Sequence, residues 1–169
     1  TVPSNAPQTN FPITIIPVAQ PTTVTITASG GGVSKTAQLN VVPAAPAGLV
    51  LQSVTGGNPA PEAQLRLTGP APAGGMTVEI SSSNPAVATL AAPAILVPAG
   101  AMSAGLKIAT VPVAQNTAVT ITGAAGGAAA TGRLTVLAPV PMSVTLAPVS
   151  VGGGTVVVGG QVVLSGPAP

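Results

Sequence analysis

The chain has almost none of the side chains that carry out enzyme chemistry. Its 169 residues contain no histidine, cysteine, aspartate, tryptophan or tyrosine, and Phe11 is the only aromatic residue. Without cysteine there is no disulfide framework, and without His, Cys or Asp there is no ligand set for a metal. The sequence therefore predicts no catalytic residue, no cofactor-binding residue, no metal site and no enzymatic activity.

Charge is scarce as well, at 4% of the residues. General acid–base catalysis needs a carboxylate placed beside a partner, and neither glutamate has a counterpart elsewhere in the chain, so we interpret both as solvated surface groups. Nucleic-acid binding needs clustered cations and stacking aromatic rings, which are absent, and nothing indicates a small-molecule substrate. The six charged residues are Lys35, Arg66, Lys107, Arg133, Glu62 and Glu79.

Two arrangements would give some of these charges a role beyond that of solvated surface groups. Arg66 and Glu79 would face each other if their segments formed a hairpin. Lys35 and Lys107 raise the idea of a Lys–Asn amide crosslink, as in some bacterial pilins, but this reaction needs a buried acid beside the pair. Ordinary exposed lysines are therefore the favoured interpretation.

Long uncharged runs at 80–106 and 134–169 are not membrane helices, because proline and glycine recur through them. The first residues lack the basic start and apolar core of a signal peptide, so we expect any export signal to lie outside this stretch. The glycine runs 30–32 and 152–154 are not followed by the Lys-Ser/Thr of a phosphate loop. We predict that they are hairpin turns.

An internal repeat organises the chain. Residues 17–27 read PVAQPTTVTIT and residues 112–122 read PVAQNTAVTIT, 95 positions later. The alignment extends in both directions, with a two-residue shift near a glycine-rich turn. The predicted units are the C-terminal part of a repeat at 1–46, one complete repeat at 47–139, and the N-terminal part of a further repeat at 140–169.

Within a unit, apolar and polar residues alternate, as in Val24 and Ile26 with threonines between them. A period of two is typical of strands with one buried face. Glycine, proline and asparagine clusters separate these segments and indicate turns. In the complete unit we expect strands near 49–54, 63–68, 76–81, 86–90, 94–97, 104–110, 117–123 and 131–137.

Seven or eight short strands in about 93 residues, without a helix, favour an all-β fold of tandem immunoglobulin-like β-sandwiches. The run from Thr77 to Leu90, TVEISSSNPAVATL, resembles the S-N-P-x-V-A-x-V signature of bacterial immunoglobulin-like domains. The segments 24–41 and 119–136 are similar to the last two strands of those domains. The resemblance implies a tandem array like those of invasin- and intimin-type surface proteins. The chain departs from it by lacking the usual Trp and Tyr, and its two glutamates cannot furnish the calcium sites found between such domains.

Low surface charge removes the repulsion that keeps copies of a protein apart, and open sheet edges without Lys or Glu lack the usual guard against pairing. The short proline-rich junctions at 43–46 and 138–141 should act as stiff spacers. We therefore expect the partners to be copies of the chain itself, in a head-to-tail homopolymer. Abundant Ser and Thr would also suit O-linked glycans.

These features predict a structural extracellular protein, a repeat segment of a bacterial surface filament, fibre or sheath. Partial units at the two ends would suit strand complementation between copies. Two alternatives stay open. The chain would also fit the stalk of a cell-surface adhesin, or a non-catalytic spacer in a secreted enzyme.

Overall fold

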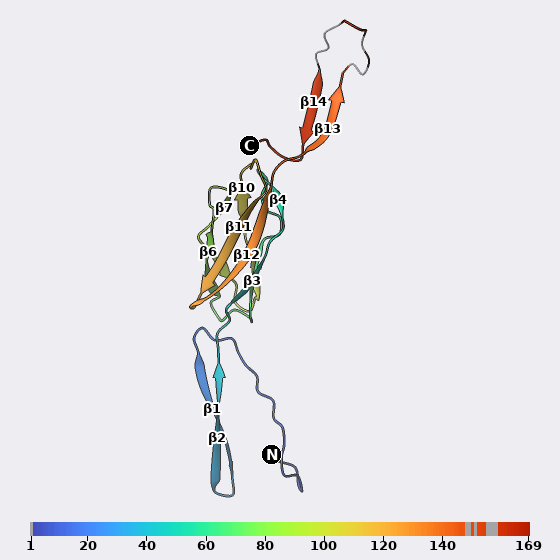
Figure 1. The fold of residues 1–169 in the computed structure, drawn as a ribbon. Coiled ribbons are helices and arrows are strands. Elements are labelled where there is room, and N and C mark those ends of the chain that lie inside the picture. The colour runs from blue at the N-terminus through green and yellow to red at the C-terminus, as the bar shows by residue number, and fades with distance from the viewer. Residues whose placement is uncertain (1, 148–149, 151, 155–158) are drawn as a thin grey trace.

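The computed structural model describes residues 2–147, 150, 152–154 and 159–169. These residues form fourteen strands and no helix, so the all-β prediction is confirmed. The molecule is elongated, with a central body (residues 46–137) and a hairpin projecting from each end (Figure 1). The strands are β1 (Thr22–Gly30), β2 (Val33–Val41), β3 (Pro46–Val50), β4 (Val54–Thr55), β5 (Gln64–Leu67), β6 (Met76–Ser82), β7 (Ala88–Leu90), β8 (Ala94–Val97), β9 (Ser103–Gly105), β10 (Ile108–Thr110), β11 (Thr117–Ala125), β12 (Ala128–Leu137), β13 (Pro141–Leu146) and β14 (Gly160–Leu164).

The central body is built from two main sheets that pack face to face. One has five strands in the order β4-β12-β11-β6-β8, and the other has three in the order β3-β5-β9. Strands β7 and β10 form a small sheet of their own. The arrangement is β-sandwich-like, with the inward residues of both sheets forming one core.

The core is wholly aliphatic. Along β11 and β12, alternate side chains are fully buried and the residues between them face outward, which is what a period of two dictates. Small side chains let the two sheets approach closely, because each fills little of the space between them. The buried hydrophobic residues in the described part of the chain all lie in the central body: Val54, Ala63, Leu65, Leu67, Ala71, Val78, Ile80, Ala88, Val97, Leu106, Ile108, Val113, Val119, Ile121, Leu134 and Val136.

Two glycines mark where the sheets come closest. A Cβ placed on Gly123 would lie 3.0 Å from Cδ1 of Leu65 in the facing sheet. A Cβ placed on Gly132 would lie 2.7 Å from the Cβ of Leu49. At these two positions a larger residue would overfill the core.

The hairpin turns follow the prediction made for the first glycine run. Gly31 and Gly32 join β1 to β2 with φ of 57° and 78°, and Gly126 and Gly127 join β11 to β12 with φ of 58° and 79°. Two consecutive residues with positive φ form the type I′ turn that suits the twist of a hairpin. The second glycine run, 152–154, lies in the connection between β13 and β14.

One predicted strand, 104–110, is wrong as a single element. Ser103–Gly105 pairs with β5 in the three-stranded sheet, whereas Ile108–Thr110 pairs with β7. The backbone changes partner at Leu106, whose N–H donates to the Ala63 carbonyl. The alternation of inward and outward side chains continues across the break, so it gave no sign of the change of partner.

The first predicted strand, 49–54, is also wrong in its bounds. β3 already begins at Pro46, opposite Leu67, because a proline is tolerated at the first residue of an edge strand. β4 is a separate two-residue strand that runs parallel to β12, with Val54 opposite Val136. The other predicted strands of the complete unit agree with the structure to within about three residues at each end.

Candidate self-association surfaces

The N-terminal hairpin reproduces the pairing of the two central strands of the core. In β1–β2, Thr22 lies opposite Val41, and in β11–β12, Thr117 lies opposite Val136. The register agrees along the whole hairpin at the offset of 95 seen in the sequence repeat. The two segments are therefore alike in backbone pairing as well as in sequence.

The C-terminal hairpin reproduces another part of the core, the β3–β5 pair. Val144 lies opposite Val162 in β13–β14, as Leu49 lies opposite Leu65 in β3–β5. Even the irregularity is the same, because the register shifts after Pro141 in one hairpin and after Pro46 in the other.

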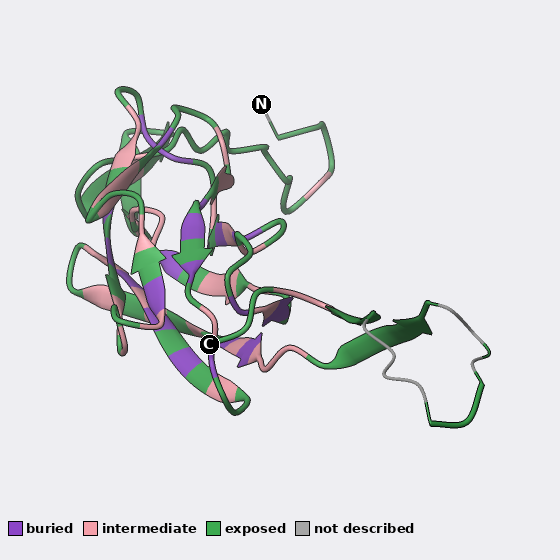
Figure 2. Ribbon diagram, turned by 90° about the horizontal axis from the view of Figure 1, so that it is seen from above, coloured by how far each residue is buried: buried purple, intermediate pink, exposed green. Residues whose placement is uncertain are grey.

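The two hairpins differ from their central counterparts in what covers them. In the central body, Ile121 and Leu65 are fully buried, because the β3–β5 and β11–β12 faces pack against each other. In the terminal hairpins the corresponding residues are less buried, and on the N-terminal one Val24 is exposed whereas Ile26, Leu39 and Val41 are half-buried. Val144 is 65% exposed and Val162 is 58% exposed. Figure 2 shows the projecting β13–β14 hairpin as exposed along nearly its whole length.

We call these two open surfaces the N-face and the C-face. Each consists of the apolar residues whose counterparts form the central core, in a sheet that lies at one end of the molecule (Figure 1). The N-face contains Val24, Ile26, Ala28, Ala37, Leu39 and Val41. The C-face contains Val144, Leu146, Val162 and Leu164.

Differences between the two copies of the repeated phrase occur in contacting pairs. In the N-terminal hairpin, the hydroxyl of Thr23 donates to Oδ1 of Asn40 across the strands at 2.8 Å. The central copy has Ala118 opposite Thr135, so both partners of that hydrogen bond have changed together.

The second pair of changes lies at the end of the hairpin. The backbone N–H of Ala138 donates to Oδ1 of Asn116 at 2.9 Å. The corresponding residues in the N-terminal copy are Pro43 and Pro21, which have no such donor and no such acceptor. The sequence analysis did not predict this hydrogen bond, although the change of both residues between the two copies could have indicated it.

The same pair of hydrogen bonds occurs near each junction between a hairpin and the central body. At the first junction, the N–H of Ala45 donates to Oγ1 of Thr68 at 3.0 Å, and the N–H of Thr68 donates to the Ala45 carbonyl at 2.9 Å. At the second, Val140 and Ser165 make the same two hydrogen bonds, at 3.0 and 2.9 Å. The first pair ties the end of the linker to the central body, whereas the second pair lies within the C-terminal hairpin, where it extends the β13–β14 ladder.

The C-terminal segment after β14 packs back on the central body. A Cβ on Gly166 would lie 2.7 Å from Cγ2 of Thr55, and a Cβ on Gly57 would lie 2.8 Å from Cγ of Pro167. Glycine at both positions permits this approach. The counterpart of Gly166 in the central body, Gly69, has open space around it.

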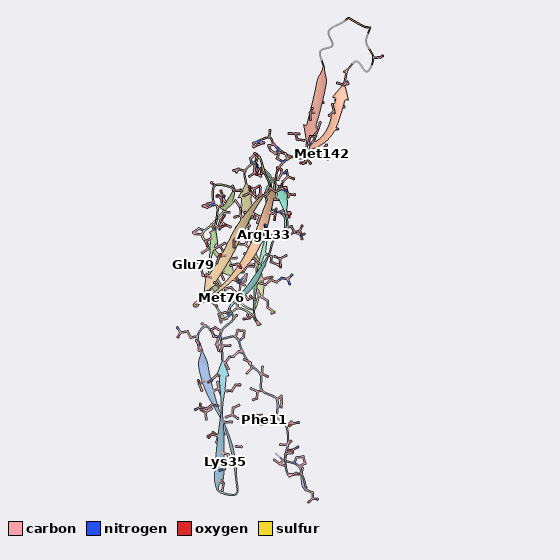
Figure 3. The ribbon with its side chains drawn as sticks, in the orientation of Figure 1. Phe11, Lys35, Met76, Glu79, Arg133 and Met142 are labelled. Carbon is pink, nitrogen blue, oxygen red and sulfur yellow. The ribbon has the colours of Figure 1, made fainter. Side chains whose placement is uncertain are left out.

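The charged residues do not form a cluster. Figure 3 shows Lys35 on the N-terminal hairpin, and Glu79 and Arg133 on the central body. Arg66 lies on β5 and Glu79 on β6, which belong to different sheets, so the hairpin that would have paired them does not form. Both residues are exposed, as are the two lysines considered for a crosslink.

The hollows in the described surface are shallow. One of about 280 Å³ is lined by aliphatic groups with a single cation, including Leu90, Leu106, Lys107 and Ile108. Within the described residues, no three metal-ligating side chains lie together, and no helix is long and apolar enough to cross a membrane. In the described structure the candidate binding surfaces are therefore the two apolar faces, and not a deep pocket.

No family model matches the chain, and no curated protein is significantly similar to it in sequence.

Proposed function

We propose that the chain is a structural protein of a bacterial surface filament, fibre or sheath, located outside the cell and built from immunoglobulin-like units. Its copies associate head to tail, which is a non-closing contact and so generates a linear assembly. The observation that carries this proposal is the pair of open apolar faces. They have the strand register of the central core, but they lie uncovered at opposite ends of the molecule.

Three further features support the proposal. The near absence of charge leaves little repulsion between copies. The hydrogen bonds between Ala45 and Thr68 tie the first linker to the central body, and residues 166–167 pack against Thr55 and Gly57 at the other end, which suits a load-bearing rod. Two packed sheets in a unit of about 93 residues suit the immunoglobulin-like class.

The same contacts at the two ends of the central body would serve the stalk of an adhesin or a spacer in a secreted enzyme, which are the alternative functions. Both would need a head or a catalytic domain elsewhere in the protein. Neither would need the open faces of separate copies to meet.

Electron microscopy of the purified 169-residue chain and of native surface material tests the proposal. We expect filaments whose axial repeat matches a whole number of units, and intact mass measurement of the native material would show whether glycans are attached. Finite rods that end in a distinct head would contradict the polymer and favour the stalk.

A further inference from the structure

The N-face and the C-face correspond to the two halves of one contact that the chain already forms in its central body. There, the β11–β12 face packs on the β3–β5 face around Gly123, Leu65 and Gly132. We propose that the N-face of one copy packs on the C-face of a second copy in this same arrangement. This inference rests on the proposed head-to-tail assembly and names its interface.

The two faces lie at opposite ends of the described structure and do not meet there, and we assign a second copy as the occupant of each. The hairpins project from opposite ends of the central body (Figure 1). They are joined to it by the short segments 42–45 and 138–140, each clamped by hydrogen bonds to the residue that follows a strand, Thr68 or Ser165. Folding the C-terminal hairpin back along the central body would displace residues 166–167, which pack against Thr55 and Gly57 of that body. A face from a second copy reaches the same position without any change in the chain.

The residues at the closest approach are matched in size. In the central body a methyl group on Gly123 would fit tightly, because Cδ1 of Leu65 would lie 3.0 Å away and would have to shift by a few tenths of an ångström. The N-face has Ala28 at the position of Gly123, which adds one carbon. The C-face has Val162 at the position of Leu65, and valine has no Cδ1. The carbon added on one face is therefore offset by the atom lost from the other.

The second close approach sets the spacing of the faces. Ala37 takes the position of Gly132, and Val144 takes that of Leu49. A Cβ on Gly132 would lie 2.7 Å from the Cβ of Leu49. Carbon atoms pack best about 3.5–4.0 Å apart, so the two hairpins must stand about 1 Å farther apart here than in the central body. The Cβ atoms of residues 37 and 144 then lie at the separation that a disulfide requires.

The segment before β1 completes the surface. Phe11 and Ile13 correspond to Leu106 and Ile108, which are buried in the central body. In this chain Phe11 is 63% exposed and Ile13 is 49% exposed. In the proposed contact they come to lie beside β14, as Leu106 and the strand before it lie beside β5.

Cysteine crosslinking tests the interface directly, because the 169 residues contain no cysteine. The variant Ala37→Cys/Val144→Cys places one thiol on each face. The matched control, Gln38→Cys/Val144→Cys, places the first thiol on the outward side of β2, at the counterpart of the exposed Arg133. After mild oxidation of the 169-residue chain, we expect a ladder of dimers and larger species for the first variant, and monomer for the control. Reduction should collapse the ladder.

Equal crosslinking of both variants would overturn the proposal, and so would the absence of crosslinking in the first. Filaments in the microscope without the Ala37→Cys/Val144→Cys ladder would leave the proposed function standing and remove this interface. The ladder without long filaments would support the interface and count against the filament. The absence of both the filaments and the ladder would reject the proposed function and this interface together.

Size exchange provides a second measurement. Ala28→Leu should overfill the contact and weaken association about tenfold or more, as overpacking does in a core. Adding Val162→Ala to the same chain should restore most of the affinity. The control Thr27→Leu adds similar bulk to the outward side of β1 and should not weaken association. If Val162→Ala fails to rescue Ala28→Leu, the two residues do not face each other. Circular dichroism of each variant checks that the central body is still folded.

Discussion

Ile26 and Ile121 occupy the same place in the two copies of the repeated phrase, yet the structure places them in different surroundings. Ile121 is fully buried in the central core. Ile26 is only half-buried, and among the described residues the β1–β2 hairpin forms a two-stranded sheet by itself. We predict that the same substitution, isoleucine to alanine, has very different effects at the two positions.

The expected cost follows from the packing. Truncating a buried isoleucine to alanine costs about 2–5 kcal/mol, because burial is lost and a cavity is left. The full burial of Ile121 between the two sheets places it in this range. A domain of about 93 residues is stable by only about 5–14 kcal/mol. Ile121→Ala should therefore remove between about a seventh and all of that stability. Ile26→Ala should change the unfolding of the central body by less than about 0.5 kcal/mol, because the residue lies outside that core.

Urea unfolding of the dilute chain, followed by far-ultraviolet circular dichroism, measures the difference. Fluorescence is unsuitable because the chain has no tryptophan or tyrosine. With a dependence on urea of about 1–1.5 kcal/mol per molar, the midpoint should fall by about 2 M for Ile121→Ala and hardly at all for Ile26→Ala. At high protein concentration Ile26→Ala should also have an effect, because it should then weaken association between copies.

Equal shifts of the midpoint for the two variants at low concentration would refute this reasoning. They would mean that the N-face is already covered within the single chain. No shift for Ile121→Ala would mean that the two sheets of the central body do not pack as described.

Three further predictions concern other contacts. Gly123→Ala should lower the free energy of unfolding by about 1–3 kcal/mol, because the added methyl group crowds Leu65. Adding Leu65→Val should recover most of that loss in a thermal unfolding experiment. Failure of this rescue would contradict the size match between the two positions. Asn116→Ala should cost about 0.5–1 kcal/mol in the same assay, because it removes the hydrogen bond to the backbone of the following linker. Gly166→Ala should detach the C-terminal segment from the central body and shift the amide resonances of residues 55–58, whereas Gly69→Ala, with nothing within 4 Å, should leave them unchanged.

Several features could be predicted from the sequence because they depend on local pattern. Alternation of apolar residues in β11 and β12 indicated strands and the face that would be buried. Paired glycines at 31–32 indicated a two-residue turn, since few other residues adopt positive φ without strain. The repeat indicated which segments would be alike, and the strand registers agree with it.

Other features were not visible in the pattern. The segment 104–110 alternates without interruption, yet it pairs with β5 at one end and with β7 at the other. Alternation reports which face of a strand is apolar, but it does not report which neighbour lies beside it. Composition alone predicted that the proline-rich junctions are stiff. It did not predict the reciprocal hydrogen bonds of Thr68 and Ser165, because their partners lie far away in the sequence.

The sequence by itself determined the all-β character and the repeat, because each depends on which residues are present and how they alternate. Only the tertiary structure decided which copies of the repeated strands are covered. VTIT reads the same at 24–27 and 119–122, but among the described residues only the second copy has a facing sheet. Burial requires that facing partner, and the partner is set by how distant segments pack rather than by the phrase itself.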